Sequence, residues 1–406
     1  MHETWRSHPS LTGRFHADAP DWIDRLPGAL ERRVARKAGW ARWLIERQDW
    51  DVFAVYFGES DTASHYLWAH HDPQSPRRPA SVSAGQRGGL QRVYEALDRA
   101  VGSLLEAAGD NQTEVTVLSD HGSGGSSDKV LHLNCLLAEH GLLRFRRRRG
   151  RNGAGLKEIA LRRFPPRLRE QLFRLGNAWL PSRLESNVRF GAIDMANTVA
   201  FSDELNYFPG IHLNMADREP NGIVRREQKR ETILKVRAAL LGARDPWSGA
   251  PVFADVIPRE ELFEGPHLDR APDLLLDLHL DNGYSYNLMP SAETTWRKLA
   301  DHEKLGKKGR SLPGSHRPHG FMALAGPKVQ SRGRIDAHIA DLSATLLCRL
   351  GLSVPPSFKG RVLWEALRDD FGESARQLPK AGPLAPHTTR NEALVESRLR
   401  ALGYIE

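Results

Sequence analysis

The fold class is decided by a stretch that reads Glu114-Val115-Thr116-Val117-Leu118-Ser119-Asp120-His121-Gly122. Its first half is apolar and β-branched, and it has the length of a buried strand. An aspartate and a histidine follow directly, and the glycines at 122, 124 and 125 predict a flexible crest after them. In open α/β sheets the functional side chains lie beyond the strand ends, so this stretch predicts such a sheet with a site at its edge.

Two further segments place ligand-type side chains beside apolar runs. Residues 52–57 are apolar and aromatic, and they predict a buried strand that leads to Asp61 and His65. If a helix follows that strand, the aspartate and the histidine share one helix face, because they are four residues apart. His316 precedes a third apolar run at 321–325, which predicts a position at the entry of a strand.

Five side chains are therefore candidate metal ligands: Asp61, His65, Asp120, His121 and His316. A mixture of carboxylate and imidazole suits zinc, with manganese as the alternative ion. Taken singly, the Asp-x-x-x-His spacing is also typical of an exposed pair on a helix. The Ser-Asp-His-Gly sequence is also typical of a turn with a capping aspartate.

The wider pattern predicts an α/β protein with layers of helix on a mostly parallel sheet. Strands are expected near 52–57, 115–118, 198–202, 273–278 and 321–325, and helices near 28–47, 85–108, 225–242 and 337–350. The polar, proline-containing residues 372–386 predict a linker to a short helix at 391–402.

The order Asp-x-x-x-His, Ser-Asp-His-Gly, Gly-x-His-Arg-Pro resembles the alkaline phosphatase superfamily, and most closely its type I phosphodiesterase and nucleotide pyrophosphatase branch. Flanking segments such as 57–61, 218–224 and 351–355 are similar to the same branch, so the resemblance covers nearly the whole length. It implies an alkaline-phosphatase-like, mostly parallel sheet sandwiched by helices in residues 1–370, with a linker and terminal helix in 371–406. It also implies a metal-dependent phosphoric ester hydrolase whose substrate is a small phosphate ester.

The resemblance implies two divalent ions, one held by Asp61, His65 and His316 and the other by Asp120 and His121. The same family takes a further aspartate from its first strand and a threonine or serine nucleophile. Upstream of Asp61 there is no strand that ends in Gly-x-Asp-Gly and no Thr or Ser in a matching context. We therefore expect the first strands and the nucleophile-bearing N-terminal portion to be missing, and the catalytic nucleophile is unknown.

Three explanations of that absence stay open: a fragment or misplaced start, a separate protein partner that completes the sheet, or a non-catalytic metal-binding or interaction protein derived from the family. Arg317, beside His316, is expected either to contact a substrate phosphate or to form a surface salt bridge.

The chain carries 58 Lys and Arg against 50 Asp and Glu, a formal net charge of +8, and the excess is concentrated in residues 144–151 and 157–174. We interpret residues 144–190 as a basic insert or cap. Its interleaved apolar residues have roughly helical spacing, so such a helix could touch anionic lipid, nucleic acid or a phosphorylated substrate. A solvated basic face is the simpler interpretation, and aromatic residues are too sparse to predict specific nucleic-acid recognition.

The two cysteines, Cys135 and Cys348, lie in apolar helical contexts, which predicts core thiols without a disulfide in a reducing compartment. The composition, 40% hydrophobic and 27% charged, is that of an ordinary globular protein. No apolar run is long enough for a transmembrane segment and no signal sequence follows Met1, so the sequence predicts a cytoplasmic location.

Overall fold

The computed structural model describes residues 21–109, 112–146, 192–205, 207–291, 294–306, 311–331 and 333–369. They divide into two compact units, each described here by itself. The first unit takes its described residues from Met1–Val34, Phe57–Leu97 and Ser123–Arg317, and the second takes them from Ala35–Tyr56, Asp98–Gly122 and Pro318–Glu406. Helices α2 (Trp22–Ile45) and α5 (Gly89–Ala108) contribute residues to both units.

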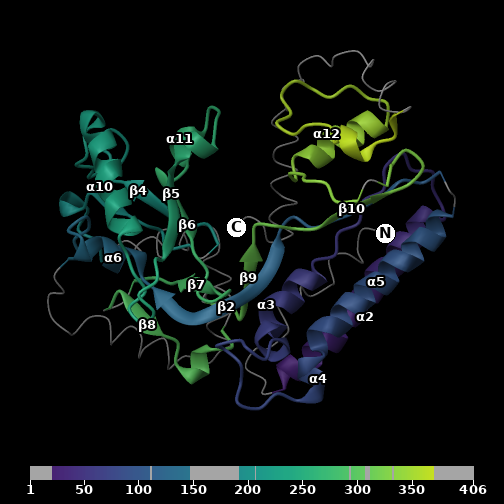
Figure 1. Cartoon of the computed structure of the whole chain (residues 1–406), viewed down its shortest axis with the longest axis horizontal. Coiled ribbons are helices and arrows are strands. Elements are labelled where there is room, and N and C mark those ends of the chain that lie inside the picture. The colour runs from purple at the N-terminus through teal and green to yellow at the C-terminus, as the bar shows by residue number, and fades with distance from the viewer. Residues whose placement is uncertain are drawn as a thin grey trace, which may run out of the picture. The chain divides into compact units, whose positions relative to one another are not determined.

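The larger core of the first unit is built on an antiparallel sheet. Its order is β3-β4-β6-β5, with β3 at Ala200–Phe201, β4 at Gly210–Leu213, β5 at Phe253–Pro258 and β6 at Leu274–Leu278. Helices α6 (Leu133–Glu139) and α10 (Lys229–Leu241) complete this layer (Figure 1). Apolar side chains from these helices and strands, such as Leu137, Ile211 and Leu240, are fully buried against one another, which fixes the sheet that borders the candidate site.

A second sheet of the first unit is organised around the long, curved strand β2 (Gly122–Leu131; Figure 1). Strand β7 (Ser285–Leu288) runs parallel to β2, β8 (Trp296–Lys298) runs antiparallel to it, and β9 (Gly314–Arg317) also pairs with it. The prediction that the glycines at 122, 124 and 125 form a flexible segment after the strand at 115–118 is wrong, because these residues belong to strand β2. A side chain at Gly124 would collide with Arg317, and one at Gly125 would collide with Tyr284 and Trp68, so these glycines allow close packing across β2.

Helix α3 (Glu59–His71) is the element of the first unit that carries the first ligand pair. Its first turn contains Glu59 and Asp61, whose negative charges favour the helix N-terminus. Apolar residues of α3 pack with the first part of α2 and with α5 in a cluster that includes Leu30, Leu67 and Val93. Helix α3 thus has one face fixed in a core, and α4 (Ala84–Arg87) follows it.

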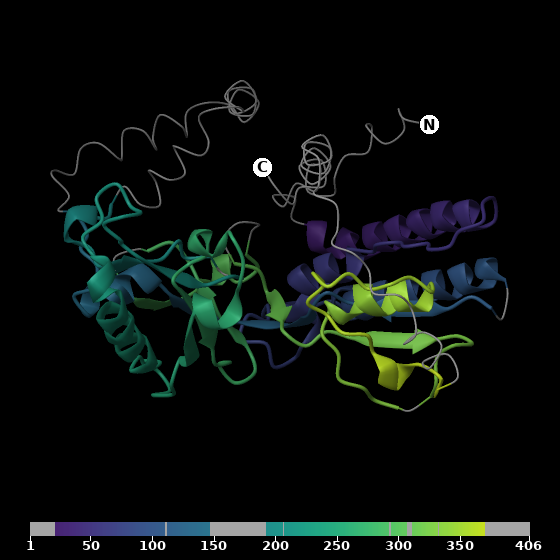
Figure 2. The same ribbon diagram turned by 90° about the horizontal axis from the view of Figure 1, so that it is seen from above.

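The second unit contains a two-stranded antiparallel sheet of β1 (Val115–Leu118) and β10 (Met322–Ala325). Helix α12 (Asp341–Arg349) lies beside this sheet in both views (Figures 1 and 2). Arg349 at its end contacts Glu114, just before β1, and donates a hydrogen bond to the Thr116 hydroxyl at 3.0 Å. These contacts attach the helix to the strand.

The remaining short elements connect these layers. They are α11 (Arg259–Leu262) and the 3-10 helices Met195–Asn197, Arg226–Gln228, Leu268–Arg270, Asp301–Glu303 and Trp364–Ala366.

The α/β class is confirmed, and so are the strands expected near 115–118, 273–278 and 321–325 and, over two residues, the strand near 198–202. The helices differ at their ends: α2 begins at Trp22 and contains Pro27, residues 84–108 form two helices around Gly88, and a 3-10 turn precedes α10. α12 is shorter than the expected helix at 337–350.

Two predictions about strands are wrong. Residues 52–57 form no assigned strand in the described structure, and Val52, Val55 and Tyr56 are 43%, 41% and 64% exposed. Apolar composition predicts a strand only where a neighbouring strand accepts its backbone hydrogen bonds. The sheets are also mostly antiparallel: β2 and β7 run parallel, whereas the pairs β1–β10, β2–β8, β3–β4, β4–β6 and β5–β6 are antiparallel.

Cys135 and Cys348 are both buried and neither is in a disulfide, as expected. Across the described ranges, we find no helix with the length and apolar character that crossing a membrane requires. Most of the basic segment 144–190 and the expected linker and helix beyond residue 370 lie outside the described residues.

Candidate metal centre

Helix α3 places the first two candidate ligands side by side. Asp61 and His65 are four residues apart, and Nε2 of His65 lies 3.2 Å from Oδ1 of Asp61. The histidine is almost buried and the aspartate is partly exposed, so the pair lies at the edge of the α3 core. The expectation that one helix face carries both side chains is confirmed.

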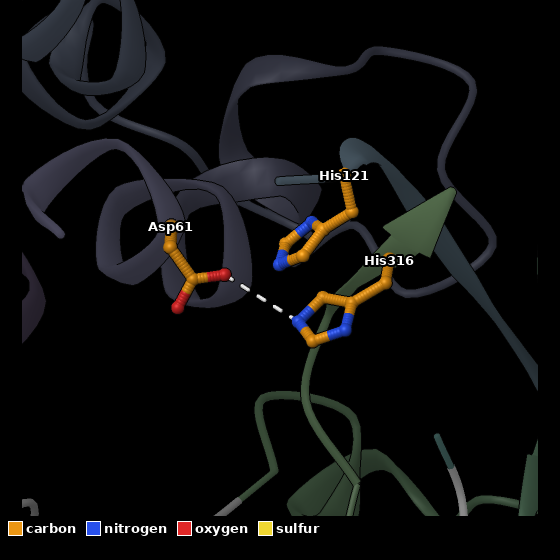
Figure 3. A group of neighbouring side chains, drawn as sticks. All are labelled: Asp61, His121 and His316. Atoms are coloured by element: carbon orange, nitrogen blue, oxygen red, sulfur yellow. Dashed lines mark ion pairs between the residues drawn. The ribbon is translucent and has the colours of Figure 1, made fainter. Parts of the chain in front are cut away.

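Strand β9 brings the third side chain to the same point. Nε2 of His316 lies 3.1 Å from Nε2 of His65 and 3.5 Å from Oδ1 of Asp61. Figure 3 shows His316 from β9 facing Asp61 from α3, with their ion pair drawn as a dashed line. Residues separated by about 250 positions therefore converge on one atom of Asp61.

This convergence depends on a close approach between β9 and α3. A Cβ at Gly314 would lie 2.1 Å from the Ser64 carbonyl oxygen, so only glycine fits there. At the same contact the Nδ1–H of His65 donates a hydrogen bond of 2.8 Å to the Gly314 carbonyl. Because a carbonyl only accepts, a neutral His65 ring directs its Nε2 lone pair at Asp61 and His316. A backbone carbonyl that fixes the other ring nitrogen is typical of metal-binding histidines.

The electrostatics of the cluster favour positive charge. Burial raises the pKa of the Asp61 carboxyl, but the imidazoles of His316 and His65 lower it further, so its pKa falls well below the usual range. Burial lowers the pKa of His65, but the Asp61 carboxylate outweighs this effect and the pKa is raised. Asp61 therefore remains a carboxylate at neutral pH, and the space between the three side chains attracts a cation.

The three side chains fit a divalent cation. Their ligand atoms are 3.1, 3.2 and 3.5 Å apart. Ligands about 2.0–2.1 Å from a tetrahedral zinc ion are about 3.3 Å apart, which is the middle of this range. Oδ1 of Asp61 is also buried without a well-formed hydrogen bond, a costly state that a bound cation would relieve.

Tyr207 is a site residue that the sequence reasoning missed. Its ring stacks on His316 with 4.6 Å between centroids and 21° between planes, and it lies 5.6 Å from the ring of His65. The available signal was the aromatic pair Tyr207-Phe208 directly before Pro209, which is unusual in a polar loop. Tyr207 shields one side of both imidazoles while remaining 46% exposed.

The Arg317 side chain is occupied by hydrogen bonds to backbone carbonyls and to one serine hydroxyl. Its guanidinium donates hydrogen bonds to the carbonyls of Gly125, Gly283 and His316 and to the Ser285 hydroxyl. These bonds join β9 to β2 and β7, so Arg317 supports the strand that carries His316. The surface salt bridge expected as one alternative is not among its interactions with the described residues.

The remaining candidates, Asp120 and His121, belong to the second unit and follow β1 directly. The Nδ1–H of His121 donates to the Gly122 carbonyl at 2.9 Å, and Nε2 lies 3.6 Å from Asp120. His121 is thus fixed by a backbone carbonyl in the same manner as His65. The side chain of Asp120 is largely exposed.

Comparison of the sequence with models of known protein families gives a match. The family model described as type I phosphodiesterase / nucleotide pyrophosphatase matches residues 2–310, which is most of the chain. The match includes Asp61, His65, Asp120 and His121 and ends shortly before His316. No curated protein matches the chain.

Proposed function

Because the chain belongs to the type I phosphodiesterase and nucleotide pyrophosphatase family, within the alkaline phosphatase superfamily, we propose that it is a metal-dependent phosphoric ester hydrolase. Asp61, His65 and His316 hold a divalent cation, with zinc favoured by the donor set and manganese as the alternative. The substrate is a small phosphate ester. The observation that carries the proposal is the convergence of three Lewis-basic atoms within 3.5 Å of one another.

Each side chain at this centre has a separate role in binding the cation or orienting its ligands. A divalent cation held there polarises a phosphoryl oxygen and makes water more acidic. The Asp61 carboxylate supplies the negative charge that retains a cation, and the two imidazoles remain neutral ligands when it is bound. The Gly314 carbonyl orients His65, and Tyr207 excludes water from one side of the imidazoles.

We further propose that Asp120 and His121 hold a second cation, as the family resemblance implies. The hydrogen bond from Nδ1 of His121 to the Gly122 carbonyl supports this, because it leaves Nε2 as the ligand atom. An ion held by Asp120 and His121 would supply further stabilisation of the negative charge that develops during hydrolysis of a phosphate ester.

The proposal is tested by hydrolysis of bis(p-nitrophenyl) phosphate after chelation and after addition of zinc or manganese. We expect turnover that requires the added ion and that falls at least a hundredfold in His316→Ala. The matched control is His140→Ala, since His140 follows α6 and is separate from the site. Turnover that survives in His316→Ala, or that ignores chelation, contradicts the assignment.

The alternative is a non-catalytic metal-binding or interaction protein. The exposed apolar side chains of Val52, Val55 and Tyr56 favour it, because contiguous exposed apolar groups commonly serve contact with another surface. Ion binding without any hydrolysis in the same assay would select this alternative.

A further inference from the structure

A cavity lies directly beside the candidate metal centre in the first unit. It has a volume of about 160 Å³, and Tyr207 and His316 form part of its wall. Leu276, Tyr286 and Leu288 line it and are buried, at 7%, 5% and 3% exposed, and His279, Ser285 and Ser315 add polar groups to the lining. The cavity wall therefore combines a candidate metal ligand with side chains of β6 and β7.

The mouth of the cavity is open to solvent. Leu280 and Tyr207 border it and are 47% and 46% exposed. The rings of Tyr207 and His316 are stacked, so the aromatic wall of the cavity and the metal ligand are in contact.

The size and lining of the cavity restrict what fits. By volume, a protein cavity of about 150 Å³ holds a benzene-sized molecule, and the serine and histidine side chains in this lining add hydrogen-bonding groups beside the apolar ones. A single ring, or a branched alkyl group of similar size, matches the cavity, whereas a purine with its ribose exceeds it. Burial of such a group against leucine and tyrosine side chains is favourable, since apolar surface leaves water.

We propose that this cavity is the subsite for the organic group esterified to the phosphate, and that it selects a monocyclic aryl or short branched alkyl group over a nucleoside. The inference rests on the proposed function, because the phosphate is placed at the cation held by Asp61, His65 and His316. Tyr207 is then the residue that connects the two parts of the site, with one face on the His316 imidazole and its ring also bordering the subsite.

Binding of two phosphonates tests the subsite without requiring turnover. Phenylphosphonate carries a ring that fits the cavity, and methylphosphonate presents the same phosphonate group with almost no apolar part. With the full chain loaded with zinc, isothermal titration calorimetry is expected to show phenylphosphonate binding at least tenfold more tightly. Adenosine monophosphate, which carries a purine nucleoside, is expected to bind more weakly than phenylphosphonate.

Leu280→Trp is the variant that tests the cavity itself. Leu280 is exposed at the mouth, so a larger side chain there narrows the entrance without overpacking the core. The ratio between the two phosphonate affinities is expected to fall from tenfold to below threefold. The matched control is Leu262→Trp in α11, which is 49% exposed and outside the cavity lining, and which keeps the ratio.

The outcomes separate the subsite from the proposed function. Equal affinity for the two phosphonates, or a ratio that survives in Leu280→Trp, overturns the subsite and leaves the metal-dependent hydrolase standing. Tighter binding of adenosine monophosphate overturns the stated selectivity. Failure of both phosphonates to bind in the presence of zinc overturns the proposed function and the subsite together.

Discussion

The close approach of β9 to α3 leads to a quantitative prediction for Gly314→Ala. The new methyl carbon would lie 2.1 Å from the Ser64 carbonyl oxygen and 2.9 Å from the His65 Cα. Because non-bonded heavy atoms need more than 3 Å, the strand and helix must separate by about 1 Å. That shift lengthens the 2.8 Å hydrogen bond from His65 to the Gly314 carbonyl beyond bonding distance.

The variant is expected to lose both stability and zinc affinity. Overpacking of this kind costs about 1–3 kcal/mol of unfolding free energy, and loss of a hydrogen bond that orients a metal ligand costs about 10–100-fold in affinity. Urea unfolding measures the first quantity, and zinc competition with a chromophoric chelator at neutral pH measures the second.

The control for Gly314→Ala is Gly39→Ala. Gly39 lies in α2, and no heavy atom lies within 4 Å of a Cβ built there. Its zinc affinity is expected to match that of the unaltered chain, and its stability is expected to rise slightly, because alanine favours a helix. Wild-type stability and wild-type zinc affinity in Gly314→Ala would refute the close packing on which the site geometry depends.

Two further predictions concern buried charges. Burial raises the pKa of Asp245, but hydrogen bonds from Lys129 and other donors lower it to about 2. The ionised carboxylate therefore stabilises the fold above pH 3.8, and this stabilisation is lost as the pH falls toward 2. The stability difference between the unaltered chain and Asp245→Asn should therefore shrink by about 1 kcal/mol between pH 6 and pH 3 in denaturant titrations, and a pH-independent difference contradicts this. Arg77 is fully buried and its guanidinium donates to four backbone carbonyls, a hydroxyl and an amide oxygen, so Arg77→Met should cost about 3 kcal/mol or more in urea unfolding. The exposed pair of Arg361 and Glu365 is the control, since Arg361→Met should leave the unfolding free energy almost unchanged, and equal losses would contradict the buried role.

Local sequence patterns predicted those parts of the site that depend on spacing along one element. The four-residue separation of Asp61 and His65 was enough to place them on one face of α3, since a helix repeats every 3.6 residues. The strand at 115–118 was visible in its β-branched residues. His316 was expected at the entry of the strand at 321–325, but it lies inside β9, a separate short strand that pairs with β2. The buried cysteines followed from the apolar character of their neighbours.

The features that the sequence did not reveal depend on distant partners. Residues 52–57 have strand composition, but pairing depends on a neighbour that composition does not specify. The glycines 124 and 125 look like a turn, although they actually make room for Arg317, Tyr284 and Trp68. Tyr207 reaches His316 only through the fold, and no local pattern encodes that contact. The cytoplasmic location and the basic cap stay predictions.

The most direct test of the central claim is zinc binding by the purified, chelator-treated chain, measured by titration calorimetry and by metal content after gel filtration. Asp61, His65 and His316 are expected to hold zinc, and Asp61→Asn is expected to lose at least tenfold in affinity because it removes the carboxylate charge and keeps the shape. Asp301→Asn, which alters an exposed aspartate outside the site, serves as the control and should bind like the unaltered chain. Zinc binding that is unchanged in Asp61→Asn, or absent from the unaltered chain, would contradict a metal centre at these residues.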